Sequence, residues 1–163
     1  SVSGEDFGKY NSFGPLAAME FQSSVEQLCF NAGGGELKAP ASRMTDFCEK
    51  KNPGSVGAVS YVPGVSPVSL WEVLPAPVAS ALQKGLIDFG KKMKGYYTRE
   101  AMLIATESRT SSPVRIPRDK ISCMHPQISG LFPCAEGAGY AGGIISAAMD
   151  GERCAEALKN YYS

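Results

Sequence analysis

Apolar residues recur at spacings of three and four in three stretches of the chain, as they do along the buried face of a helix. The first stretch follows Pro15 and ends at the glycines of 33–35, since glycine favours the left-handed cap of a helix. The second runs from about Pro77 to Lys92, and the third begins near Ile144. In the third helix we expect a buried stripe of Ile144, Ile145, Ala148, Met149, Ala155 and Leu158.

Shorter elements are expected between these helices. The pattern predicts an extended piece, a turn at Pro40 and a short helix around 42–51, and a second short helix after Ser69. The prolines of 52–77 rule out a central strand there and favour a loop with an edge strand near 56–61. The apolar runs "AMLI" from residue 101 and "GLFPCAE" at 130–136 predict two short strands. This mixture favours an α+β (α/β) fold.

Charge and hydropathy exclude several classes of protein. The chain has 163 residues, with 16 basic and 16 acidic side chains, so no electrostatic partner such as nucleic acid is indicated. No apolar run approaches the roughly 20 residues of a membrane span, and the first residues lack the apolar core of a signal peptide.

Cysteine and histidine usage bears on redox state and on metals. The 5 cysteines are an odd number, widely spaced and without a C-x-x-C pair, which favours a reducing compartment over a disulfide framework. His125 is the only histidine, so a Cys/His zinc site lacks partners at usable spacing, and we expect no metal.

The stretch "LFPCAEGAGYAGGIISAAMDGERCAEAL" (131–158) places an acid and a glycine-rich turn directly before a helix. The first N–H groups of a helix have no intrahelical partner, and glycines at 137, 139, 142 and 143 let a phosphate approach them. Glu136 is placed to accept hydrogen bonds from sugar-like hydroxyls. A dinucleotide cofactor presents both a phosphate and sugar hydroxyls. A helix start that packs tightly on a strand without a ligand is the alternative, because "GAGYAGG" is not the G-x-G-x-x-G fingerprint.

This stretch and "TESRTSSPVRIPRD" resemble the C-terminal part of a family of uncharacterised FAD-dependent oxidoreductases. Members are often named NAD(FAD)-utilizing dehydrogenases and occur in bacteria and in plastid-bearing eukaryotes. The similarity continues through "GPLAAMEFQSSVEQLCFNAGGGELKAPASRMTDF" and "YVPGVSPVSLWEVLPAPVASAL", and so covers nearly the whole chain.

The resemblance implies two domains. Residues 1–105 resemble a substrate domain, and residues 106–163 resemble the C-terminal strand and helix that return to a Rossmann-like FAD-binding domain. The chain contains no strand-associated G-x-G-x-x-G, so we expect the ADP-binding N-terminal half to be absent from it. Another protein chain would have to supply that half.

The resemblance also implies the site residues. The cofactor-binding set would be Ala135, Glu136, Gly137, Gly139, Tyr140, Ala141, Gly142, Gly143 and Ile144. Many relatives have glycine where this chain has Ala135. Tyr140 would stack on the flavin or pack in the core. Arg109 and Arg115 would be catalytic and would place a substrate carboxylate or a nicotinamide phosphate, unless they pair with Glu107, Glu136 or backbone carbonyls.

These observations favour the C-terminal part of an FAD-dependent oxidoreductase. It would contribute the flavin side of the site for hydride or electron transfer to a small-molecule substrate, with NAD(P)H as the candidate electron donor. The alternatives are a non-catalytic remnant that serves as a structural subunit of a larger complex, and an independent small-molecule binding module. The expected location is a bacterial cytoplasm or a plastid stroma.

Overall fold

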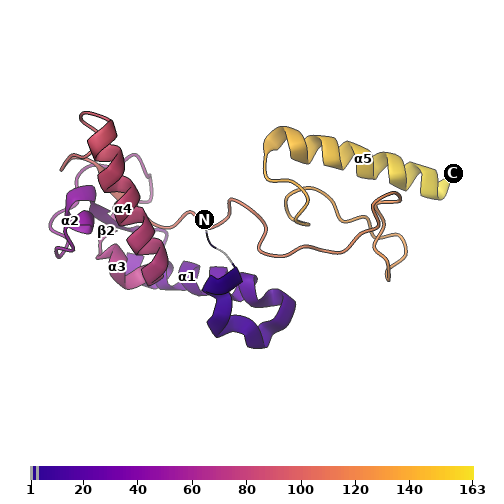
Figure 1. Cartoon of the computed structure of the whole chain (residues 1–163), viewed down its shortest axis with the longest axis horizontal. Coiled ribbons are helices and arrows are strands. Elements are labelled where there is room, and N and C mark those ends of the chain that lie inside the picture. The colour runs from indigo at the N-terminus through magenta and orange to yellow at the C-terminus, as the bar shows by residue number, and fades with distance from the viewer. Residues whose placement is uncertain (1, 3) are drawn as a thin grey trace. The chain divides into compact units, whose positions relative to one another are not determined.

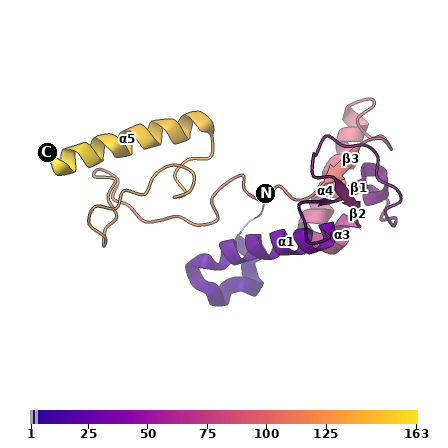
Figure 2. The ribbon, with the colours of Figure 1, turned by 180° about the vertical axis from the view of Figure 1, so that it is seen from behind.

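The computed structural model describes residues 2 and 4–163 and divides the chain into two compact units. The N-terminal unit contains residues up to Asn11 and Glu20–Ser108, and the C-terminal unit contains Ser12–Met19 and Arg109–Ser163. Figures 1 and 2 show their helices and strands from opposite sides. The roles that the resemblance implies for residues 1–105 and 106–163 stay predictions.

The three long helices that the apolar spacing predicts are present. They are α1 (Ala17–Gly33), α4 (Ala76–Lys92) and α5 (Ile144–Tyr162). A 3-10 helix, η1 (Gly4–Leu16), precedes α1, and α2 (Met44–Cys48) and α3 (Leu70–Val73) are short. The glycines end α1 as predicted: the Gly35 N–H donates to the Phe30 carbonyl at 3.0 Å, and Gly34 and Gly35 have φ of +114° and +73°.

A small sheet lies in the N-terminal unit, with strand order β2-β1-β3 (Figure 2). Its strands are β1 (Ala39–Arg43), β2 (Val65–Pro67) and β3 (Met102–Ile104). β1 is parallel to β2 and antiparallel to β3. This mixture of helices and a small sheet is consistent with the predicted α+β class.

The turn predicted at Pro40 and the edge strand predicted at 56–61 are wrong. Pro40 lies in β1, the middle strand, where it lacks an N–H but its carbonyl accepts the Ala105 N–H at 3.0 Å. The neighbouring Ala39 N–H bonds the Gly64 carbonyl on the β2 side at 3.2 Å. The edge strand is therefore the one that follows Gly64, whose φ of +87° turns the chain into it.

The strand predicted at 130–136 is also wrong, because residues 131–134 have no regular secondary structure and a turn begins at 135. Side chains bond the backbone there instead of a neighbouring strand. Arg118 donates to the Pro133 carbonyl at 2.8 Å, and the Ala135 N–H donates to Asp150 at 2.8 Å. Of the strand and helix predicted at the C-terminus, only the helix α5 is present.

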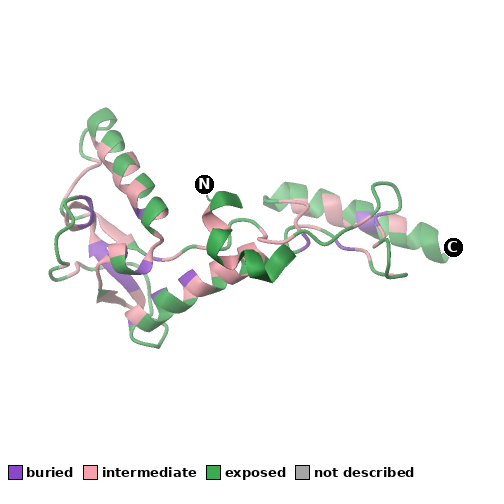
Figure 3. Ribbon diagram, turned by 60° about the horizontal axis from the view of Figure 1, so that its bottom comes forward, coloured by how far each residue is buried: buried purple, intermediate pink, exposed green. Residues whose placement is uncertain are grey.

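The core of the N-terminal unit forms where the short helices meet α1, α4 and the sheet (Figure 3). Phe47 of α2 is 2% exposed and stacks on Trp71 of α3, with 5.3 Å between ring centroids. The Trp71 indole N–H also donates to the Phe47 carbonyl at 2.9 Å. The stacked rings bury aromatic surface and the indole N–H has a hydrogen-bond acceptor, so this contact stabilises the packing of α2 against α3.

The stripe of α5 that the sequence predicts to be buried is exposed, and much of this helix is green in Figure 3. Ile144, Ile145 and Met149 are 90%, 72% and 65% exposed. The helix packs instead through Ala147, Asp150 and Cys154, of which only Cys154 is fully buried. An apolar pattern shows that a face is suited to burial but not what covers it.

Replacement of Phe47 should destabilise the N-terminal unit. We expect Phe47→Ala to lower the free energy of unfolding by about 3–5 kcal/mol, because it opens a cavity under Trp71. Trp71 is the only tryptophan, so urea denaturation followed by its fluorescence reports on this unit. The control Leu37→Ala, at a position 75% exposed, should change stability by no more than about 0.5 kcal/mol. Equal urea midpoints for the two variants would contradict the assigned core.

Candidate functional site

The glycine-rich segment forms a compact turn that leads into α5. The Gly139 N–H donates to the Glu136 carbonyl at 2.9 Å, and the Tyr140 N–H donates to the Ala135 carbonyl at 3.0 Å. Gly143 caps α5: its N–H bonds the Ser146 hydroxyl at 3.2 Å, and its carbonyl accepts the Ala147 N–H at 2.8 Å. The turn of residues 135–143 therefore delivers the chain to a helix N-terminus, where the dipole favours negative charge.

The four glycines of this turn play different structural roles. Gly139 has a φ of +81°, and a Cβ there would lie 2.6 Å from the Val114 carbonyl oxygen, so the fold itself requires glycine. A Cβ at Gly137 would meet nothing within 4 Å, and one at Gly142 or Gly143 would meet only a serine hydroxyl at 3.9 or 3.5 Å. At these three positions the chain's own packing does not require glycine.

A buried ion pair holds this turn against α5. Arg118 Nη2 lies 2.5 Å from Asp150 Oδ1, and Arg118 Nη1 lies 2.9 Å from Asp150 Oδ2. The two side chains are only 6% and 12% exposed. Arg118 Nη1 also donates to the Pro133 carbonyl, and Asp150 also accepts the Ala135 N–H. Ala135 has a φ of +57°, a conformation that costs an alanine roughly 1–2 kcal/mol, and the bond to Asp150 offsets part of this cost.

This pair shifts the pKa of both partners. Its hydrogen bonds hold the pKa of the Asp150 carboxyl below its usual range and raise the pKa of the Arg118 guanidinium. The carboxylate is therefore ionised at neutral pH despite its burial. Because the charges are removed from water, loss of one partner would leave the other buried and uncompensated, which is strongly destabilising.

Tyr140 lies against two arginines of the preceding segment. The Arg118 guanidinium carbon is 3.6 Å from the centre of its ring, and that of Arg115 is 4.4 Å away. The phenol donates to the Ile116 carbonyl at 2.9 Å. The structure thus brings two of the predicted site residues together, Arg115 and Tyr140. Their roles in catalysis and in cofactor binding stay predictions.

The remaining predicted residues lie on or near the surface. Glu136 is exposed at the start of the turn, and Arg109 is exposed where the C-terminal unit resumes. Sequence reasoning missed Arg118 and Asp150 as parts of the site. The sequence does contain an indication for Asp150. It shares one helix face with the small residues Ala147 and Cys154, three residues before it and four after it, and this face is the one that packs.

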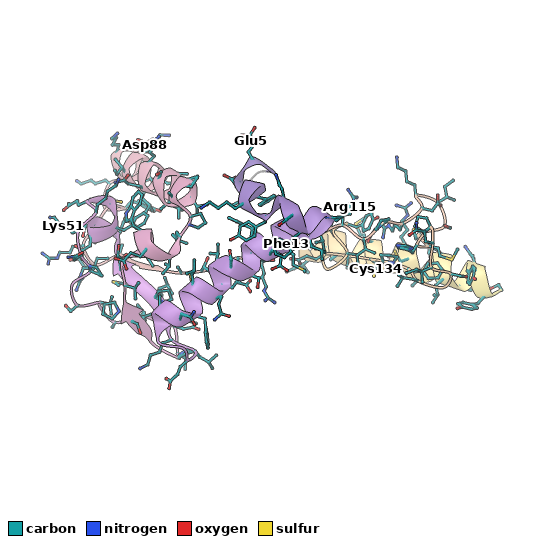
Figure 4. The ribbon with its side chains drawn as sticks, turned by 90° about the horizontal axis from the view of Figure 1, so that it is seen from below. Glu5, Phe13, Lys51, Asp88, Arg115 and Cys134 are labelled. Carbon is teal, nitrogen blue, oxygen red and sulfur yellow. The ribbon has the colours of Figure 1, made fainter. Side chains whose placement is uncertain are left out.

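The cysteines of the C-terminal unit differ in exposure. Cys123 and Cys154 are buried, and Arg118 donates to the Cys154 sulfur at 3.0 Å. Burial raises the pKa of the Cys154 thiol to about 11, so this thiol is neutral at physiological pH. Cys134, labelled in Figure 4, is exposed, although it lies in the apolar run that the sequence predicts to be a strand. Among the residues that the structure describes, no three His, Cys, Asp or Glu side chains are grouped so that they could hold a metal ion.

The N-terminal unit has an apolar cavity of its own. Val78, Leu82 and Leu86 of α4 face β3 across an open space of about 510 Å³. Residues 102–107 line its other side. A space of this volume is within the range of small-molecule sites, and its lining suits an apolar group.

One protein family, described as "FAD-dependent protein, C-terminal domain-like", matches residues 1–110. The chain belongs to this family. The match includes the small sheet and ends before the glycine-rich turn. The family supports a flavoprotein-related domain and an association with FAD, as the resemblance implied.

A relative in Clostridium beijerinckii, named "Uncharacterized protein", is 46% identical over 158 residues. The similarity covers 96% of this chain and therefore includes the turn of residues 135–143. It covers 29% of the relative, so the chain spans less than a third of that protein's length. Within the described part of the chain, none of the helices is both long and apolar enough to cross a membrane.

The different roles of the glycines can be tested without a ligand. We expect Gly139→Ala to destabilise the C-terminal unit by at least about 1–2 kcal/mol, from the left-handed conformation alone. Gly137→Ala should change stability by no more than about 0.5 kcal/mol. Urea denaturation followed by the NMR amide signals of α5 measures both variants. A similar loss in the two would mean that the turn does not have the conformation described.

The ion pair also predicts a dependence on pH. Because the Asp150 pKa is lower in the folded than in the unfolded chain, the pair stabilises above the usual aspartate pKa of about 3.9, and this contribution is lost as the pH falls through the folded value. The stability difference between the wild type and Asp150→Asn should therefore be largest near neutral pH and shrink below about pH 4. Denaturation followed by the α5 signals at several pH values checks this, and a difference that does not change with pH would contradict it.

Proposed function

We propose that residues 106–163 form the flavin side of an FAD site and that the turn of residues 135–143 contacts the cofactor. The observation that carries the proposal is that Gly137, Gly142 and Gly143 each have room for a Cβ, so neither backbone conformation nor packing explains why glycine stands there. Glycines at a helix start without a packing reason are expected where a ligand approaches the backbone. Membership of an FAD-dependent family supports the same cofactor.

The residues of the turn fit such a group chemically. Glu136 is exposed at its start and would accept hydrogen bonds from ribityl or ribose hydroxyls. The N-terminus of α5 would hold negative charge of the pyrophosphate or of the reduced flavin. When bound, FAD supplies hydride or electron transfer. Arg115, exposed beside Tyr140, would orient a substrate carboxylate or a nicotinamide phosphate, with NAD(P)H as the proposed electron donor.

The rest of the site would come from outside the turn. The similarity covers 29% of the clostridial relative, and the rest of that protein is long enough to include the dinucleotide-binding part that the proposal requires. The exposed apolar stripe of α5 supports a protein surface that covers it, because contiguous apolar patches mark interaction sites. The cavity between α4 and β3 supports a substrate domain in residues 1–105.

A non-catalytic structural subunit is the second candidate function. The exposed stripe of α5 supports it equally, since an apolar face suits assembly whether or not a flavin is bound. Bacterial cytoplasm or plastid stroma remains the proposed location for either function, and the five free cysteines suit a reducing compartment.

The visible absorption spectrum of the chain, purified natively with whatever binds it, separates the two functions. We expect flavin bands, and we expect Gly142→Ala to weaken flavin binding about tenfold, the effect of roughly 1.4 kcal/mol, because its methyl group would occupy the room that the proposal gives to the cofactor. The matched control is Gly151→Ala in α5, where a Cβ also meets nothing within 4 Å but lies outside the turn. It should retain flavin like the wild type.

A colourless wild-type preparation would contradict the flavin proposal and favour the structural subunit. Equal flavin content in the Gly142 and Gly151 variants would show that the flavin binds without contact to this turn.

A further inference from the structure

Arg118 is the residue through which the parts of the C-terminal unit are connected. Its Nη1 donates to Asp150, to the Pro133 carbonyl at 2.8 Å and to the Cys154 sulfur at 3.0 Å. Its Nη2 donates to the second Asp150 oxygen at 2.5 Å. The face of the guanidinium covers the Tyr140 ring. One planar group therefore contacts α5, the segment before the turn, and the turn itself, which a lysine could not do.

Asp150 extends these contacts to the other side of Cys134. Its Oδ2 accepts the Ala135 N–H at 2.8 Å, while Arg118 binds the Pro133 carbonyl two residues earlier. The backbone is thus held on both sides of an exposed residue, immediately before the glycines. The Ala135 carbonyl in turn accepts the Tyr140 N–H at 3.0 Å, so the constraint reaches the far part of the turn.

We propose that Arg118 and Asp150 are positioning residues that form a clamp and set the conformation of the turn of residues 135–143 for its ligand. The cofactor part of this inference rests on the function proposed above for the turn. The clamp itself concerns only the chain's own atoms. A turn with three glycines free of packing constraints has many accessible conformations, and the clamp selects one of them before the ligand binds.

The test is amide hydrogen exchange in the natively purified protein, combined with its flavin spectrum. In Asp150→Ala we expect exchange at Ala135 and Tyr140 to accelerate at least tenfold relative to the wild type, and by a larger factor than exchange in the interior of α5. The same variant should bind flavin at least tenfold more weakly, and the visible bands of the residual flavin should shift. Arg118→Lys, which keeps the charge but loses the planar fork, should show the same changes to a smaller extent.

Arg153→Ala is the matched control. Arg153 also lies on α5 and bonds a backbone carbonyl, but that carbonyl belongs to Lys120 in the preceding loop. Its loss should leave exchange at Ala135 and Tyr140, the flavin affinity and the flavin bands unchanged.

The outcomes separate this inference from the proposed function. If exchange at the two turn amides is unchanged in Asp150→Ala, or if α5 loses protection to the same extent, the clamp is overturned in favour of general stabilisation. An unchanged flavin affinity and spectrum, with the turn amides exposed, would overturn its role in binding. If the wild type carries no flavin, the proposed function fails, and a larger acceleration of exchange in the turn than in α5 still supports the clamp.

Discussion

The C-terminal unit depends on one buried ion pair. Arg118 and Asp150 connect α5 to a long segment without regular structure, and the backbone groups that a sheet would have paired bond these two side chains instead. A buried pair is favourable only when further hydrogen bonds satisfy its remaining donors and acceptors. Here Pro133, Ala135 and Cys154 provide them. In this unit the ion pair and its hydrogen bonds stabilise the packing, as the apolar core does in the N-terminal unit.

The two units show how differently a fold can be held together. In the N-terminal unit, α2 and α3 pack on the small sheet, α1 and α4 add residues to the core that contains Phe47 and Trp71, and burial of apolar area dominates. In the C-terminal unit α5 uses a narrow face of small residues, and its large apolar residues remain exposed. An ion pair needs only a few well-placed atoms, so it can hold a helix whose apolar face is available to another surface.

The same division applies to the glycines of the turn. Gly139 lies against the Val114 carbonyl and is required by the fold, whereas Gly137, Gly142 and Gly143 have room for a Cβ. One glycine of the turn is required by the backbone conformation and packing, and the other three leave the backbone accessible. This combination suits a turn that keeps one conformation and still admits a ligand. Tyr140 also stabilises the conformation of the turn, because Arg118 covers its ring and its hydroxyl donates to the Ile116 carbonyl.

Local rules in the sequence determined the three long helices, the short helices α2 and α3, the strand β3, the glycine cap of α1 and the position of the turn before α5, because spacing and glycine placement act over a few residues. Tertiary structure decided three further features. Pro40 occupies a middle strand because only its carbonyl is needed there, and the apolar run at 130–136 is not a strand because Arg118 and Asp150 bond its backbone. The exposure of Ile144 and Met149 was equally undetermined. The sequence pattern shows which side chains and backbone groups are suited to burial or hydrogen bonding. Whether they are buried or bonded depends on the partners that folding brings next to them.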